Sequence, residues 1–188
     1  MKTEIKKLIL NGKAHSVEVD IFDESDKKPV CDMYELWAKL SNSLNEYKCR
    51  KSNFPEISEI FFCLIYDSWR VNATSIPGEH SSFDCYNPNT QKTIQIKATS
   101  VKGDLTSFGP KSKWDELYFL DFYNNGNYDG SFDVYLIPND IIYNTKVNER
   151  QTFEMKQMTG QRPRFSIKKK IIEPLDMKPL ERFNLCDL

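Results

Sequence analysis

Hydrophobic and polar residues alternate along the first part of the chain, which is the periodicity of a half-buried β-strand. One such run covers Ile5–Leu10 and a second covers His15–Phe22. Asn11-Gly12 lies between them, and both residues of this pair tolerate the positive φ that a tight hairpin turn requires. The pattern therefore predicts an N-terminal β-hairpin.

The pattern then changes to the three- and four-residue spacing of an amphipathic helix. We expect a charged loop over Asp23–Lys28 and a long helix that starts with Pro29 in its first turn. Its apolar stripe would pack on the core and consists of Met33, Leu36, Trp37, Leu40, Leu44 and Tyr47. A second helix is expected to start near Pro55, with a stripe formed by Ile57, Ile60, Phe61, Leu64 and Ile65.

Strand patterns return in the middle of the chain. A run ending at Tyr86, a turn at Asn87–Thr90 and the alternating run Thr93–Ala98 predict a second hairpin. Leu117–Phe122 and Phe132–Ile137 are expected to be two further strands joined by a turn rich in Asn, Gly and Asp. A short strand is expected near Arg164–Ile167.

The second hairpin carries the most informative polar residues. Asp84 would lie on its first strand, diagonally close to Gln95 on the second, and Lys97 shares the side of Gln95. The Asp84 carboxylate, the Gln95 amide oxygen and the Ile96 carbonyl could hold Mg²⁺, which prefers a few oxygen ligands. Lys97 could orient an attacking water and offset negative charge. An ordinary half-exposed strand is the alternative interpretation, because so short a pattern also occurs by chance.

A carboxylate on the preceding helix could join this site. Glu56 and Glu59 are three residues apart, so they lie on one side of a helix. Glu59 is the preferred metal ligand and Glu56 is its rival. A solvated acidic first turn, which suits the helix dipole, is the alternative.

Two basic segments could contact a phosphate backbone. Lys111, Ser112 and Lys113 follow a Gly-Pro pair in an irregular loop. Arg162, Arg164 and a lysine run that starts at Lys168 form the other segment, and arginine can read guanine bidentately. The alternatives are a solvated loop and a basic surface tail.

Composition limits the class of protein. A chain of 188 residues with 39% hydrophobic content suits one globular domain, and no apolar run is long enough to span a membrane. The cytoplasm is therefore the expected location. Five scattered cysteines without C-x-x-C spacing are expected to be buried thiols rather than a zinc site. The net charge of −1 does not by itself indicate nucleic-acid binding, but the clustering of the basic residues does.

These pieces occur together in a recognisable order. Asn53–Glu59, Phe83-Asp84, Ile94–Thr99, Leu105–Ser112 and Gln161–Ser166 follow one another along the chain. In this the chain resembles small type II restriction endonucleases of the PD-(D/E)XK superfamily, over most of its length. The resemblance assigns the invariant-type acid to Asp84, the second acidic position to Gln95, the motif lysine to Lys97 and the helix-borne acid to Glu59.

The resemblance implies an α/β (α+β) fold, restriction-endonuclease-like, with a central mixed β-sheet flanked by helices. It implies a single domain over 1–188, comprising an N-terminal hairpin and helix (1–50), a catalytic core (53–138) and a basic DNA-contacting segment (150–188). A homodimer, Mg²⁺-dependent cleavage of double-stranded DNA to 5′-phosphates and a companion DNA methyltransferase are also implied. Within this class, the resemblance favours enzymes that cut a short interrupted palindrome of the GC-N-GC kind.

The chain departs from the family pattern in two ways. Gln95 stands where an acid is usual, and a neutral amide binds Mg²⁺ more weakly than a carboxylate does. The helix expected between the last two core strands is not evident, so the sheet is expected to gain an antiparallel strand. A non-catalytic DNA-binding protein with a decayed nuclease site is therefore the alternative function, and an interaction protein without a nucleic-acid role is a third.

Overall fold

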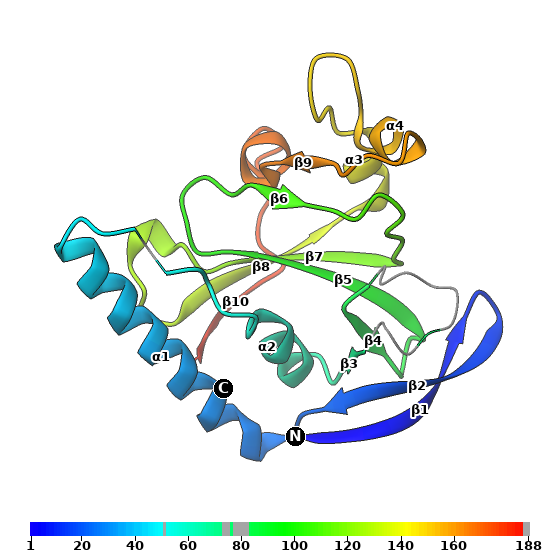
Figure 1. Cartoon of the computed structure of the whole chain (residues 1–188), viewed down its shortest axis with the longest axis horizontal. Helices are drawn as coiled ribbons and strands as arrows, with labels where there is room; N and C mark the ends of the chain where they lie inside the picture. Colours follow the sequence, from blue (N-terminus) through cyan, green and yellow to red (C-terminus); the bar gives the residue numbers. More distant parts are fainter. Residues whose placement is uncertain (51, 73–75, 77–82, 186–188) are drawn as a thin grey trace.

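A twisted eight-stranded sheet forms the centre of the computed structural model, which describes residues 1–50, 52–72, 76 and 83–185 (Figure 1). The strands follow the order β1-β2-β3-β4-β5-β7-β8-β10. Their bounds are β1 (Lys2–Leu10), β2 (Lys13–Ile21), β3 (Trp69–Val71), β4 (Cys85–Asn87), β5 (Lys92–Thr99), β7 (Glu116–Asp121), β8 (Ser131–Ile137) and β10 (Glu181–Asn184).

The sheet is mixed because one neighbouring pair is parallel. β5 and β7 run side by side in the same direction, whereas the other neighbours are antiparallel. A parallel pair needs a crossover connection, and residues 100–115 provide it. Within this crossover, β6 (Thr106–Ser107) pairs with β9 (Arg164–Phe165) as a separate two-stranded sheet.

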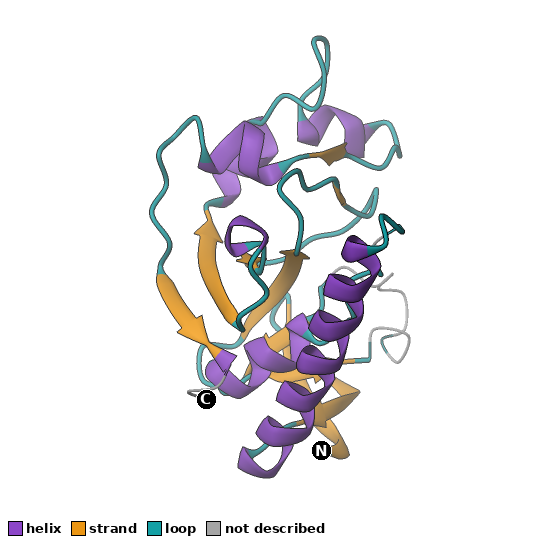
Figure 2. Cartoon of the chain, turned by 90° about the vertical axis from the view of Figure 1, so that its left-hand side faces the viewer, coloured by secondary structure: helices purple, strands orange, loops and turns teal. Residues whose placement is uncertain are grey.

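Helices and loops cover both faces of the large sheet (Figures 1 and 2). On one face, α1 (Glu24–Glu46) and α2 (Ser58–Ile65) pack with the strand residues Ile94 and Ile96. On the other, Leu117 and Phe119 pack against α3 (Asn139–Asn144), α4 (Phe153–Met158) and the π-helix η3 (Lys168–Ile172). A short 3₁₀ turn, η2 (Asn124–Gly126), lies between β7 and β8. This architecture confirms the predicted fold class.

The predicted hairpins are confirmed. Leu10 pairs with Lys13 across a two-residue turn in which Asn11 and Gly12 both have positive φ. β4 and β5 form the second hairpin, with Cys85 opposite Ile94. β7 and β8 are antiparallel neighbours without an intervening α-helix, as expected. β10, for which the sequence analysis predicts no strand, extends the sheet by pairing with β8.

The start of α1 was predicted wrongly. The helix begins at Glu24 rather than at Pro29, because Asp23 caps it. The Asp23 Oδ1 accepts a hydrogen bond from the Ser25 N–H (2.9 Å), and the Asp23 N–H donates to the Asp26 Oδ2 (3.0 Å). This reciprocal capping satisfies two backbone groups that would otherwise lack partners. Pro29 thus lies inside the helix.

The buried face of α1 also differs from the prediction. Trp37 is buried as expected, but the helix packs through Val30, Tyr34 and Ala38 beside it. The larger part of the predicted stripe is exposed instead. Helical periodicity alone does not distinguish two apolar faces on one helix.

No helix in the described ranges combines the length and apolar character that a membrane crossing requires.

The cap provides a test of this account of α1. Asp23→Ala removes the side-chain acceptor, so we expect the free energy of unfolding to fall by about 1 kcal/mol in urea titrations. Glu35→Ala, at an exposed position of the same helix, is the control and should change stability by less than about 0.5 kcal/mol. Equal effects of the two substitutions would contradict the capping role.

Candidate active site

Asp84 lies at the junction of three strands. It directly precedes β4, and its N–H donates to the Ile94 carbonyl of β5 (2.9 Å). Its own carbonyl accepts a hydrogen bond from the Val71 N–H of β3 (2.9 Å). Main-chain bonds on both sides therefore fix the position from which the Asp84 side chain extends.

The Asp84 carboxylate contacts β5 directly. Its Oδ2 accepts hydrogen bonds from the Ile96 N–H (2.7 Å) and from the Gln95 amide. The same amide nitrogen also donates to the Ile96 carbonyl (3.3 Å), and Gln95 is buried. The structure thus brings together Asp84, Gln95 and Ile96, as the sequence predicts.

This arrangement suits a cation. The Gln95 NH₂ group, a donor, lies between the Asp84 carboxylate and the Ile96 carbonyl, which are two oxygen acceptors. A half-turn of the amide would present Oε1 at the same place and complete a set of oxygen ligands of the type that Mg²⁺ prefers. Within the described residues, no group of three His, Cys, Asp or Glu side chains forms a metal site. The donor set therefore depends on the amide and the carbonyl.

Glu59 supplies a second carboxylate from the first turn of α2. Its pKa is raised from 4.5 to about 7, mainly by burial and secondly by the nearby Asp84 charge. Glu56 contributes a smaller effect of the same sign from the exposed turn before the helix. Glu59 is thus the more buried of the two rival acids.

Asp84 and Lys97 are electrostatic neighbours. Burial raises the pKa of Asp84, and the Lys97 charge is the largest influence that opposes this rise. The Lys97 ammonium also lies 5.7 Å from the centre of the Phe108 ring, which comes from the crossover connection. Lys97 therefore lies between the carboxylates and the crossover that covers β5.

Arg70 belongs to this neighbourhood, although the sequence analysis did not identify it. It lies on β3 opposite Cys85 and forms a bidentate pair with the Asp20 Oδ2 (2.7 and 3.2 Å). Its charge lowers the pKa of Glu59. A single arginine in a short strand carries no sequence signal, because only the sheet brings it near the acids.

Two buried thiols connect the elements that carry the acids. Cys63 on α2 and Cys85 on β4 lie with their sulfur atoms 3.5 Å apart. Both were expected to be buried, but that expectation is wrong for Cys49, which is exposed. Cys31 is half-buried, and Cys186 is outside the described residues.

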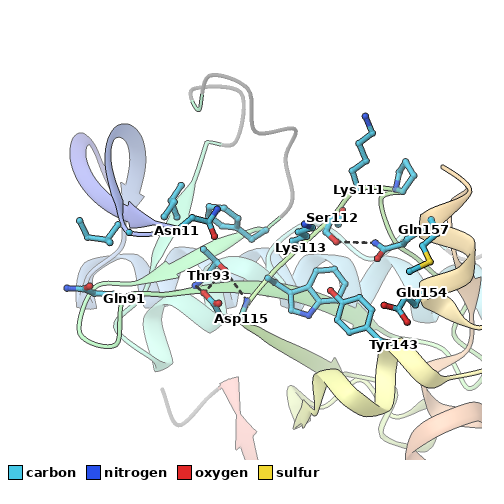
Figure 3. A pocket seen from close by; sticks show the side chains of 17 residues that line it. Asn11, Gln91, Thr93, Lys111, Ser112, Lys113, Asp115, Tyr143, Glu154 and Gln157 are labelled. Carbon is cyan, nitrogen blue, oxygen red and sulfur yellow. Dashed lines mark hydrogen bonds between the residues drawn. The ribbon is translucent and has the colours of Figure 1, made fainter.

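A groove of about 1120 Å³ opens next to the hairpin that carries Asp84 (Figure 3). Phe83 and Thr93, near Asp84 and Gln95 in the chain, line it together with the Asn11-Gly12 turn. The crossover loop and α4 form its other wall, which includes Lys111, Ser112, Lys113, Glu154 and Gln157. The groove is therefore bordered by two lysines and by chain neighbours of Asp84 and Gln95, while Asp84, Gln95, Lys97 and Glu59 themselves are not among its lining residues.

The loop that carries the lysines is held in place by polar contacts. The Gln157 side chain of α4 donates to the Gly109 and Ser112 carbonyls, both at 3.0 Å. A Cβ at Gly109 would collide with the Ser112 hydroxyl, which would have to rotate away to make room for a larger residue. Ser112 is buried, whereas Lys111 and Lys113 are exposed. Ser112 thus shapes the loop that presents the lysines.

The second basic segment divides into exposed and paired residues. Arg162 and Arg164 are exposed on either side of the buried Pro163, and the Arg164 Nε donates to the Ser107 hydroxyl (3.3 Å). Lys168 instead forms a largely buried ion pair with Asp121. The arginines are therefore available to a ligand, while the Lys168 charge already has a partner.

Comparison with known proteins is consistent with this site. The family model described as Bsp6I restriction endonuclease matches residues 22–174. The chain is also 34% identical over 167 residues to the type II restriction enzyme Bsp6I of Bacillus sp. (strain RFL6), covering 87% of this chain and 90% of the relative. The chain belongs to the Bsp6I restriction endonuclease family. This confirms the predicted class, a type II restriction enzyme. No solved structure matches the chain.

The region matched by the Bsp6I family model contains the acids, Lys97 and both basic segments. It leaves out β1, β2 and β10. The two outer parts of the large sheet therefore lie beyond the matched region, while the β4–β5 hairpin and the crossover lie within it.

The pKa of Glu59 leads to a prediction for the metal-free protein. Because the folded-state pKa exceeds the unfolded value of 4.5, the folded protein retains a proton that the unfolded chain loses. Stability should fall as the pH rises from about 4.5 to about 7, by at most roughly 3 kcal/mol for this group. Glu59→Gln should reduce that fall in urea titrations.

Glu56→Gln, at the exposed neighbouring position, is the matched control for this experiment and should alter the pH dependence of stability much less than Glu59→Gln does, because Glu56 has only a small effect on the pKa of Glu59. An unchanged pH dependence in Glu59→Gln would mean that Glu59 is not the buried acid.

Proposed function

We propose that this protein is a Mg²⁺-dependent type II restriction endonuclease that cuts double-stranded DNA at a short palindrome and leaves 5′-phosphates. The observation that carries the proposal is the cluster of Asp84, Gln95, Lys97 and Glu59 in a member of the Bsp6I family. The recognition site is proposed to be of the GC-N-GC kind, as the resemblance implies.

The metal would be held by the carboxylates of Asp84 and Glu59, the Gln95 amide oxygen and the Ile96 carbonyl. Bound Mg²⁺ supplies positive charge to the scissile phosphate and acidity to a coordinated water. Both carboxylates have raised pKa values, so they favour protonation when no cation is present. A divalent cation would favour their charged forms, which argues that the site suits a metal.

Lys97 is proposed to orient the attacking water and to stabilise the negative charge that develops on the phosphate. Water then attacks phosphorus, the bond to the 3′ oxygen breaks, and the phosphate stays on the 5′ end. The position of Lys97 supports this role, because its ammonium lies near the Phe108 ring and its charge acts on the carboxyls of Asp84 and Glu59.

DNA is proposed to enter along the groove. Lys111 and Lys113 would contact phosphates, and the buried Ser112 would keep their loop in shape. Arg162 and Arg164 would contact bases or phosphates from the β9 segment. Lys168 is less suited to direct contact because Asp121 pairs with it.

A palindrome presents the same half-site twice, and cutting both strands requires two active sites. A homodimer with two-fold symmetry satisfies both requirements. A DNA methyltransferase that protects the same sequence is the expected partner in such a restriction system.

A non-catalytic DNA-binding protein is the second candidate, and Gln95 is the observation that favours it. The amide removes one negative charge from the site and donates a hydrogen bond to Asp84. Sequence-specific binding in gel shifts, with no cleavage in Mg²⁺ or Mn²⁺, would support this candidate over the nuclease.

Cleavage of plasmid DNA tests the proposed reaction. With Mg²⁺ at low salt we expect discrete fragments whose ends map to one palindromic sequence. Lys97→Ala should lower the cleavage rate by at least about 100-fold, because it removes charge stabilisation, while gel-shift affinity changes little.

Lys178→Ala, an exposed residue paired with Asp176, is the control and should cut at the wild-type rate. Plasmid DNA that stays intact with each divalent cation tested would refute the nuclease proposal.

Salt dependence tests the proposed groove contacts. Lys111→Ala and Lys113→Ala should each weaken binding to all DNA sequences and lower the slope of log affinity against log salt by about 1. Lys39→Ala, on the exposed side of α1, should leave this slope unchanged. Fluorescence anisotropy over a salt series measures all three variants, and identical slopes would place the DNA elsewhere.

A further inference from the structure

The longest helix, α1, has large apolar residues on two different faces. One face packs on the core, and the other is turned to solvent along the outside of the molecule (Figure 2). The exposed fractions on the outer face are 43% for Met33, 67% for Leu36, 51% for Leu40 and 80% for Tyr47, and Leu44 is half-buried. We call these five residues the outer stripe. So much exposed apolar surface on one helix indicates a binding surface.

The outer stripe is symmetric about Leu40. Met33 and Tyr47 are each seven residues from Leu40, and Leu36 and Leu44 are each four residues from it. Seven and four residues correspond to nearly whole turns of an α-helix, so all five lie along one side. The spacing of the apolar positions is therefore the same in both directions from Leu40.

We propose that a second copy of this chain packs on the outer stripe, with the two α1 helices antiparallel about a two-fold axis at Leu40. An antiparallel copy places Leu40 against Leu40, and the symmetric spacing then gives every other member of the stripe an apolar partner. Met33 meets Tyr47 of the other copy, and Leu36 meets Leu44. An isologous contact requires such self-complementarity, whereas a different partner protein does not.

Charge also favours this pairing. The axis that superimposes Leu36 on Leu44 brings the exposed Asp32 of one copy near the exposed Lys48 of the other, which follows the C-cap of α1. Asp32 already pairs with Lys28 of its own helix (3.0 Å), so Lys48 would add a second cation near this carboxylate. Opposite charges therefore lie at both ends of the apolar contact.

The location of the stripe is compatible with the proposed DNA groove. α1 packs on the sheet face that carries Ile94 and Ile96. Trp114 and Tyr143, which line the groove, pack on the opposite face. Pairing through α1 therefore leaves the groove open. It would supply the contact surface of the homodimer in the proposed function, and only the role of the dimer in DNA cleavage rests on that proposal.

The size of the outer stripe indicates how tightly the two copies should associate. The stripe runs from Met33 to Tyr47, which corresponds to about 21 Å of helix. One helical face covers less than the roughly 800 Å² per partner of a standard interface. We therefore expect a reversible dimer whose population rises with protein concentration.

A cysteine at the proposed axis gives the sharpest test. In a background with Cys49→Ser and Cys186→Ser, Leu40→Cys should form a covalent dimer under copper phenanthroline, because Leu40 faces its own copy. Leu36→Cys is the matched control. Its two copies would be about 12 Å apart along the helices, too far for a disulfide. Equal cross-linking of both variants, or none of Leu40→Cys, would overturn the antiparallel arrangement.

Sedimentation velocity over a concentration series measures the association itself, without DNA or metal. The wild type should rise from the 22.0 kDa of one chain towards twice that mass, while Leu36→Asp with Leu40→Asp should stay monomeric and keep its helical circular dichroism. Leu175→Asp, at a site 53% exposed, is the control and should dimerise like the wild type. A monomeric wild type at all concentrations refutes this surface but not the nuclease, whereas a dimer that cuts no DNA refutes only the nuclease.

Discussion

The Asp84 carboxylate accepts hydrogen bonds from the Ile96 N–H and the Gln95 amide, and this junction of β4 and β5 fixes the candidate active site. A buried carboxylate is costly unless such donors stabilise its charge. Here the donors come from the neighbouring strand, so the register of one hairpin decides whether the acid is tolerated. The same register places Lys97 two residues beyond Gln95, next to the acids.

The parallel pairing of β5 and β7 has consequences for the whole binding surface. It requires the crossover of residues 100–115, and this connection carries Phe108 over Lys97 and presents Lys111 and Lys113 at the groove. The same connection supplies β6, which holds β9 and its arginines. The buried Asp104 of the crossover joins it to the segment after β9 by accepting hydrogen bonds from the Ser166 hydroxyl and the Ile167 N–H. One topological requirement thus brings candidate catalytic residues and basic residues together.

Sequence reasoning was most successful where the chemistry is local. The hairpin turns at Asn11-Gly12 and before β5 follow from residues adjacent in the chain, and they place Asp84 beside Gln95. Sequence reasoning failed for α1, whose sequence is compatible with two start positions and with two buried faces. Pro29 suggested a helix start, but Asp23 and Asp26 form a stronger one five residues earlier. The apolar stripe of α1 suggested the core face, while Val30, Tyr34 and Ala38 are the residues that pack.

The sequence by itself determined the fold class, the family and the set of residues that could carry the chemistry, because these depend on periodicity and on motifs of neighbouring residues. Only the tertiary structure decided that Glu59 is more buried than Glu56, that Arg70 lies near Glu59, and that Lys168 is paired with Asp121. Burial and charge pairing depend on which elements pack together in space. No local pattern records that information, and for this reason the same apolar helix could be read as core from its sequence and as an outer surface from its fold.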